Sequence, residues 1–127
     1  MKISKSHEDY LEAIVSLGGS PEISVRSVDI AKSMGVSKAS VSKAVSYLKE
    51  YGLLDQPYYG DITLTRAGYE YGCKVVERHD LLLAFMEKVL DIPTETAEEE
   101  AHLMEHAISD ESFERWTAYI KQLGVEY

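Results

Sequence analysis

The sequence predicts a mainly α-helical protein, with an N-terminal winged helix-turn-helix over residues 1–70 and an α-helical domain over residues 71–127. Three observations support this fold class. Two short amphipathic segments meet at Gly35, two strand-like segments follow them directly, and helical periodicity resumes over the rest of the chain. With 127 residues, 45% of them hydrophobic, the chain is long enough for a core in each part.

Serine caps and glycine stops define the elements of the first half. We expect a helix capped by Ser6 and ended by Gly18-Gly19, a helix over 27–34, a tight turn at Gly35, a helix from its N-cap Ser37 to about Tyr51, and short strands over 53–57 and 61–65. The two strands flank Tyr58-Tyr59-Gly60, so they form a hairpin, or wing, behind the helix-turn-helix.

Three helices are expected in the second half. They are a long helix from about Arg66 to Leu90 that stops before Pro93, a helix from Thr94 or Thr96 to near Ile108, and a helix capped by Ser109 or Asp110. The last two helices carry aromatic and aliphatic faces in a part too small to bury them alone. We therefore expect a homodimer through these helices, which makes the second half a dimerisation domain.

The formal charge of −9 is unevenly placed. Residues 1–74 carry nine Lys/Arg and nine Asp/Glu, whereas residues 75–127 carry four Lys/Arg and thirteen Asp/Glu. An acidic protein has no general attraction for nucleic acid, so DNA binding must come from the neutral first half. Cations are the ligands that the acidic second half favours.

The start of the 37–51 helix has the composition of a DNA-reading surface. Its side chains are short or cationic, and a helix entering the major groove contacts bases with such N-terminal residues. The predicted DNA-binding residues are Ser37, Lys38, Ser40, Ser42, Lys43 and Arg66. Phosphates could be neutralised by the cationic residues Lys32, Lys38, Lys43, Lys49 and Arg66. A protein-interaction module is the alternative, because winged helices also serve as one and serines cap any helix.

His102, Glu105 and His106 fall on one arc of a helix, beside its apolar arc. A solvated acidic face with two incidental histidines is an equally reasonable interpretation of this helix alone. His79 favours the metal site, because it lies at the centre of an apolar stripe and faces inward. A lone inward histidine is usually a hydrogen-bonded core residue. Here, however, the acidic cluster around Glu105 requires a further ligand that faces inward.

Asp9 and Glu12 add two carboxylates on one side of the first helix. Asp9 could instead complete a capping box with Ser6, and Glu12 could be solvated. Together the candidate metal ligands are Asp9, Glu12, His79, His102, Glu105 and His106, with Glu98 as a possible extra. Carboxylates and imidazoles without thiolate suit Mn²⁺, Fe²⁺, Co²⁺ or Zn²⁺ and argue against Cu⁺.

An enzyme must also be considered, since His102-x-x-Glu105-His106 matches the signature of inverted zinc peptidases. Such a site needs a third protein ligand, an open coordination position and a substrate cleft. Only 21 residues follow His106, and more than half of the chain is the winged helix. We therefore predict that the protein is not an enzyme and has no small-molecule substrate.

The combined motifs resemble the diphtheria-toxin-repressor family of metal-dependent repressors over nearly the whole chain. EDYLEAI, RHDLL and MEHAIS resemble the segments that supply the ligands of its short manganese-responsive branch, which lacks an SH3-like domain. The resemblance implies a transcriptional repressor that senses Mn²⁺ or Fe²⁺ as corepressor, binds a palindromic operator in double-stranded DNA as a homodimer, and controls metal-homeostasis genes. A metal-independent winged-helix regulator remains the alternative.

Four positions differ from one or the other branch of the family. His102 stands where the manganese branch has glutamate and the iron-responsive members have cysteine, and an imidazole cannot bridge two metals. The imidazole of His102 shifts the metal preference toward Fe²⁺, Co²⁺ or Zn²⁺. Asp9, which stands where the iron-responsive members have a methionine, shifts it back toward harder ions. Glu98 and Leu83 replace a histidine and a glutamate of the ancillary site, so we expect that site to be absent in its usual form.

The cellular compartment of the protein is predicted from its targeting signals and its cysteine content. The start MKISKSHEDY has no apolar core of a signal peptide, and no stretch of about 18 apolar residues is present. A single cysteine, Cys73, suits a reducing compartment. We therefore predict a cytoplasmic protein without a membrane partner.

Overall fold

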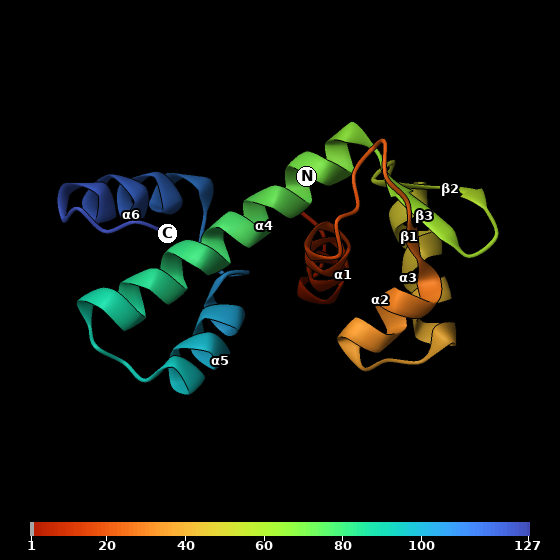
Figure 1. Ribbon diagram of the computed structural model, residues 1–127. Helices are drawn as coiled ribbons and strands as arrows, with labels where there is room; N and C mark the ends of the chain where they lie inside the picture. Colours follow the sequence, from red (N-terminus) through yellow and green to blue (C-terminus); the bar gives the residue numbers. More distant parts are fainter. Residues whose placement is uncertain (1) are drawn as a thin grey trace. The chain divides into compact units, whose positions relative to one another are not determined.

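The computed structural model describes residues 2–127, which form two compact units that divide between Lys74 and Val75. The first unit contains α1 (Lys5–Ser16), β1 (Val25–Arg26), α2 (Ser27–Met34), α3 (Lys38–Glu50), β2 (Leu54–Tyr58), β3 (Asp61–Leu64) and the start of α4 (Arg66–Ala84) (Figure 1). The second contains the rest of α4, a π-helical segment η1 (Phe85–Val89), α5 (Thr94–Met104) and α6 (Asp110–Gln122).

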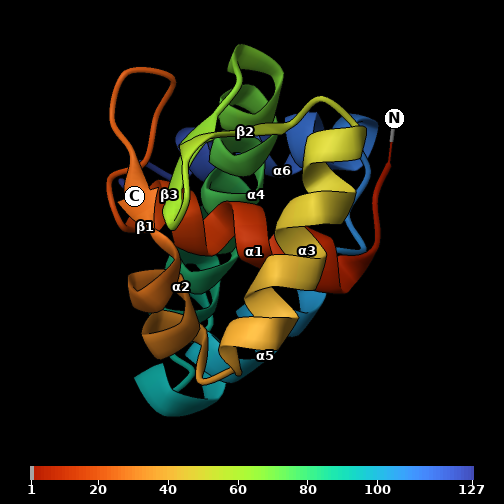
Figure 2. The same cartoon turned by 90° about the vertical axis from the view of Figure 1, so that its right-hand side faces the viewer.

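The helix-turn-helix follows the sequence prediction closely. Helix α2 ends at Gly35, whose φ of 65° lies in the left-handed region that favours glycine. Ser37 then caps α3, and its Oγ accepts a hydrogen bond from the backbone N–H of Ser40 at 3.0 Å. Figure 2 shows α2 and α3 in front of α1. The predicted winged helix-turn-helix is therefore confirmed.

The cap of α1 differs from the prediction. Ser4, and not Ser6, has the extended backbone of an N-cap, and its Oγ accepts from the N–H of His7 at 3.2 Å. Ser6 lies inside the first turn, because the helix already begins at Lys5. Asp9 therefore falls too far along the helix to complete a capping box with the cap residue, which removes the capping role considered above.

The wing is a three-stranded antiparallel sheet with the order β1-β3-β2. Strands β2 and β3 were expected, and they pair through Leu54 with Leu64, with an irregularity between Asp55 and Tyr58. Strand β1 was not expected, since its two residues are too few to show a period. It pairs with β3 through Val25 and Ile62.

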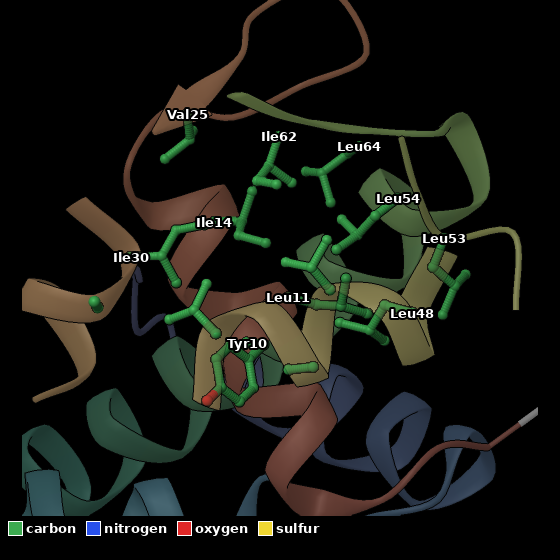
Figure 3. Packing of buried hydrophobic residues seen from close by; sticks show 14 of the residues in the cluster. Tyr10, Leu11, Ile14, Val25, Ile30, Leu48, Leu53, Leu54, Ile62 and Leu64 are labelled. Carbon is green, nitrogen blue, oxygen red and sulfur yellow. The ribbon is translucent and has the colours of Figure 1, made fainter. Parts of the chain in front are cut away.

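Apolar side chains of every element meet in the core of the first unit. Figure 3 shows Leu11 and Ile14 of α1 facing residues of α2, α3 and the sheet, among them Ile30, Leu48 and Ile62. Glycine permits the close approach of α4 to this core. A Cβ at Gly68 would lie 1.9 Å from the backbone oxygen of Leu53, so only glycine fits there.

The second unit is built around the latter part of α4, with α5 and α6 on either side of it (Figure 1). Leu81 and Leu82 of α4, Ala101 of α5 and Ile120 of α6 are fully buried together. Phe85 opens η1 and meets Trp116 of α6 edge to face, with ring centroids 5.1 Å apart. The predicted long helix thus changes to π-helical geometry before its expected end.

Helix α5 ends at Met104, earlier than the predicted end near Ile108. Residues 105–107 form a turn, and Ser109 adopts the extended backbone that lets its Oγ accept from the N–H of Ser112 at 3.1 Å. Because Ser109 caps α6 in this way, α5 cannot continue into it. None of the helices in residues 2–127 combines the length and the apolar character needed to cross a membrane.

Candidate metal centre and nucleic-acid interface

His79 of α4 lies between two carboxylates. Its Nδ1 is 2.9 Å from Glu105 Oε1, and its Nε2 is 2.7 Å from Glu98 Oε1. The side chain of His79 is only 13% exposed. The inward histidine of the sequence analysis is therefore not packed in an apolar core but is held by acidic groups from α5 and the turn after it.

Glu105 is the most unusual polar residue of the second unit. Its side chain is 0% exposed, and besides His79 its Oε1 lies 3.2 Å from Nδ1 of His102. Its other oxygen, Oε2, is buried and has no hydrogen-bond partner among residues 2–127. A buried carboxylate oxygen without a donor is costly, so this position favours a positive charge beside it.

The acidic surroundings change the protonation of His79. The hydrogen bond with Glu105 raises the pKa of His79 from 6.5 to about 9, against the opposing effect of burial, and Glu98 raises it further. At neutral pH in the absence of metal, His79 is therefore an imidazolium cation between two carboxylates. Its proton supplies the positive charge that the buried Glu105 requires.

His102 and His106 complete this group. The ring centroids of His79 and His102 are 6.4 Å apart, and those of His102 and His106 are 5.7 Å apart. His106 is buried, whereas His102 is exposed. The second unit thus gathers three imidazoles and a buried carboxylate without a thiolate, a donor set that fits Mn²⁺, Fe²⁺, Co²⁺ or Zn²⁺.

Asp9 and Glu12 belong to the first unit, where both are half-buried on α1. Neighbouring Glu8 has a structural role instead, because it is buried and accepts a 2.5 Å hydrogen bond from the hydroxyl of Tyr71. Asp9 and Glu12 remain predicted ligands from the sequence.

The predicted DNA-reading residues of α3 all lie exposed at its start: Ser37, Lys38, Ser40, Ser42 and Lys43. Lys38 and Ser42 line a groove of about 350 Å³ together with Arg26, Gln56 and Tyr59. A surface that combines the start of α3 with the wing is the arrangement that a winged helix presents to DNA.

Sequence reasoning missed the groove residues outside α3. Arg26 joins the groove through the unexpected strand β1, and Tyr59 stands at the tip of the wing, fully exposed. The only available signal was the pair of tyrosines in the predicted hairpin. Arg66, in contrast, is exposed at the start of α4 and lines a separate hollow with the loop after α1.

The environment of Glu105 argues against a hydrolytic role. In an inverted zinc peptidase the glutamate activates a water molecule, which requires access to solvent and substrate. Glu105 is fully enclosed, and its Oε1 faces His79 and His102. This enclosed carboxylate, with imidazole nitrogens beside it, has no route by which a substrate could reach it.

Comparison with known proteins shows the family of the chain. The N-terminal DNA-binding domain of the iron-dependent repressors matches residues 2–61, and the metal-binding and dimerisation domain of those repressors matches residues 65–125. An uncharacterised HTH-type transcriptional regulator of Methanocaldococcus jannaschii is 32% identical over 121 residues, covering 94% of this chain and 96% of that protein. The transcriptional regulator MntR of Escherichia coli O6:H1 is 30% identical over 120 residues, or 94% and 76% of the two chains.

Two solved structures are similar as well. A manganese-dependent transcriptional repressor in complex with manganese is 31% identical, with a TM-score of 0.78, over 91% of this chain and 52% of that one. ScaR with bound Zn²⁺ is 29% identical, with a TM-score of 0.74, over 91% and 53%. The chain thus spans about half the length of these two solved structures. The two domain matches show that the chain belongs to the iron-dependent repressor family of metal-dependent DNA-binding transcriptional regulators.

Proposed function

We propose that this protein is a transcriptional repressor for which Mn²⁺ or Fe²⁺ is the corepressor, and that it controls metal-homeostasis genes. The observation that carries the proposal is Glu105, a fully buried carboxylate grouped with three histidines and with one oxygen lacking a hydrogen-bond partner among residues 2–127. A bound divalent cation supplies positive charge at this position.

The proposed ligands in the second unit are His79, Glu105, His106 and His102. Asp9 and Glu12 are added from the sequence as the carboxylates of α1. His102 supplies an imidazole where the two branches of the family have a carboxylate or a thiolate. This imidazole favours a single ion and widens the acceptable metals to Co²⁺ and Zn²⁺ in vitro.

Metal binding by groups of α1 together with groups of the second unit would favour one arrangement of the DNA-binding unit. Such a coupling is typically worth about 1–3 kcal/mol, or roughly 5–150-fold in DNA affinity.

The partners that we propose are double-stranded DNA with a palindromic operator and a second copy of this chain. The exposed apolar residues of the second unit support the dimer, since Leu103, Tyr119 and Leu123 are large, apolar and open to solvent. Two copies of α3 held at a fixed spacing would read two half-sites related by symmetry.

A metal-independent regulator is the second candidate function. It is favoured by His79, whose two ring nitrogens both have carboxylate partners. In that case the histidine–carboxylate network stabilises the fold, and DNA affinity does not depend on metal.

Fluorescence anisotropy distinguishes the two functions. The full chain is titrated onto labelled DNA from upstream of its own gene, anaerobically, with chelator, Mn²⁺, Fe²⁺ or Zn²⁺ in turn. Tightening by at least fivefold with one or two ions, lost in His106→Ala, supports the repressor. Tight binding that is indifferent to the chelator supports the metal-independent regulator instead.

A further inference from the structure

Glu98 is the residue beside the candidate metal centre that the proposed ligand set does not use. It lies on α5, with its side chain 55% exposed, and its Oε1 is 2.7 Å from Nε2 of His79. The opposite ring nitrogen, Nδ1, is 2.9 Å from Oε1 of the buried Glu105. The two carboxylates therefore hold opposite edges of one imidazole ring.

The two edges of His79 are chemically unequal. On the Nδ1 edge, Glu105 is fully buried and also lies 3.2 Å from Nδ1 of His102, so several donor atoms converge. On the Nε2 edge, the partner is a half-exposed carboxylate, and Leu83, one helical turn further along α4, offers no donor atom. The Nδ1 edge is the one that suits an ion.

We infer that Glu98 is a positioning residue for the proposed metal centre and not a ligand. In the neutral ring that binds an ion, the Glu98 carboxylate accepts the Nε2–H of His79, which leaves the lone pair of Nδ1 for the ion. The inference rests on the proposed function, because it assigns Glu98 a task only if His79 binds an ion.

The physical reason is that a neutral imidazole carries one hydrogen and one lone pair. Either nitrogen can carry the hydrogen, so a free ring divides between two tautomers and several orientations. A carboxylate that accepts the N–H of the other nitrogen selects one tautomer and one orientation of the ring. It also makes the metal-binding nitrogen a stronger electron donor. Removing such an outer partner typically lowers metal affinity about 10–100-fold.

Two substitutions separate positioning from mere charge. Glu98→Ala removes the acceptor of the Nε2–H, so we expect a 10–100-fold loss of metal affinity. Glu98→Gln keeps an amide oxygen that accepts the same hydrogen bond, so we expect most of the affinity to return. Glu99→Gln and Glu99→Ala make the same changes at the next position of α5, which is also exposed, and should leave affinity unchanged.

The experiment uses the full chain with Zn²⁺, a diamagnetic ion, and has two readouts. Competition with a chromophoric chelator gives the affinity, and ¹⁵N NMR of the histidine rings gives the state of each nitrogen of His79. In the wild type we expect hydrogen on Nε2 and metal on Nδ1. In Glu98→Ala we expect lower affinity with a broadened or mixed His79 signal, and circular dichroism verifies that the helices persist.

The failures of the two proposals are distinguishable. If the wild type binds no metal, both the proposed function and this inference fall. If it binds metal without His79, only the inference falls. If the wild type binds metal but its Nε2 is the coordinated nitrogen, or if Glu98→Ala changes neither affinity nor the ring signals, only the inference falls. Equal loss in Glu98→Ala and Glu98→Gln would make Glu98 a ligand, which also overturns the inference.

Discussion

In the metal-free protein, Glu105→Gln should lower the pKa of His79 from about 9 back toward 6.5. Glu105 is the largest cause of the raised pKa, through a 2.9 Å hydrogen bond in a site that solvent does not reach. Gln has nearly the same shape but no charge, so it removes the electrostatic partner without opening a cavity. Glu98 remains and still raises the pKa of His79, while burial lowers it, so the pKa of His79 in the variant should lie well below 9.

The magnitude follows from linkage between protonation and folding. A rise in pKa from 6.5 to about 9 corresponds to about 3 kcal/mol. Because Glu98 is half-exposed and screened by water, we expect roughly 1–2 kcal/mol in practice. The folded pKa lies above the unfolded one, so this stability is fully present below pH 6.5 and is lost as the pH rises through 9.

The assay has a direct and an indirect part, both with chelator present. NMR titration of the His79 ring should give a midpoint near 9 in the wild type and a lower one in Glu105→Gln. Urea unfolding between pH 6.5 and 9.5 should show the wild type losing roughly 1–2 kcal/mol more than the variant. A wild-type midpoint near 6.5, or the same midpoint in both proteins, would refute the reasoning.

Three further predictions concern the two units separately. His106→Ala should remove the metal-dependent gain in DNA affinity, about 5–150-fold, while circular dichroism shows an intact fold; a normal metal response would exclude His106 as a ligand. Lys43→Ala should weaken DNA binding and reduce the salt slope by about 1 without changing metal affinity, whereas Lys121→Ala should change neither. Gly68→Ala should cost about 3 kcal/mol of unfolding free energy in urea, because its Cβ meets the carbonyl oxygen of Leu53, and a cost below about 1 kcal/mol would contradict that contact.

Local chemistry explains why the helix-turn-helix could be predicted from the sequence. A left-handed glycine at Gly35 and a capping serine at Ser37 act within three residues, so their signals are complete in a short segment. The same local rules left Ser4 and Ser6 as competing caps, since each precedes helix-forming residues. Ile3, next to Ser4, is buried, and its N–H donates to the hydroxyl of Tyr71, a contact distant in the chain that the sequence pattern does not contain.

The candidate site was predictable only as a set of residue types on helix faces. Periodicity placed His79 inward and put His102, Glu105 and His106 on one arc, and the family resemblance connected them. The sequence did not show that Glu98 and Glu105 hold opposite edges of the His79 ring, since they lie 19 and 26 residues from His79 in the chain. The helical period fixes the direction in which a side chain points around the axis of its own helix. It does not fix which neighbouring helix that side chain faces.

The sequence by itself determined the order of the elements, the neutral and acidic halves, and the ligand chemistry, because each depends on residue type and short-range spacing. Only the tertiary structure decided that Glu105 is fully buried, that His79 is cationic without metal, and that β1 brings Arg26 to the groove beside α3. These features depend on the approach of elements distant in the chain. Burial and approach set the electrostatic energy of a group, and no local pattern records them.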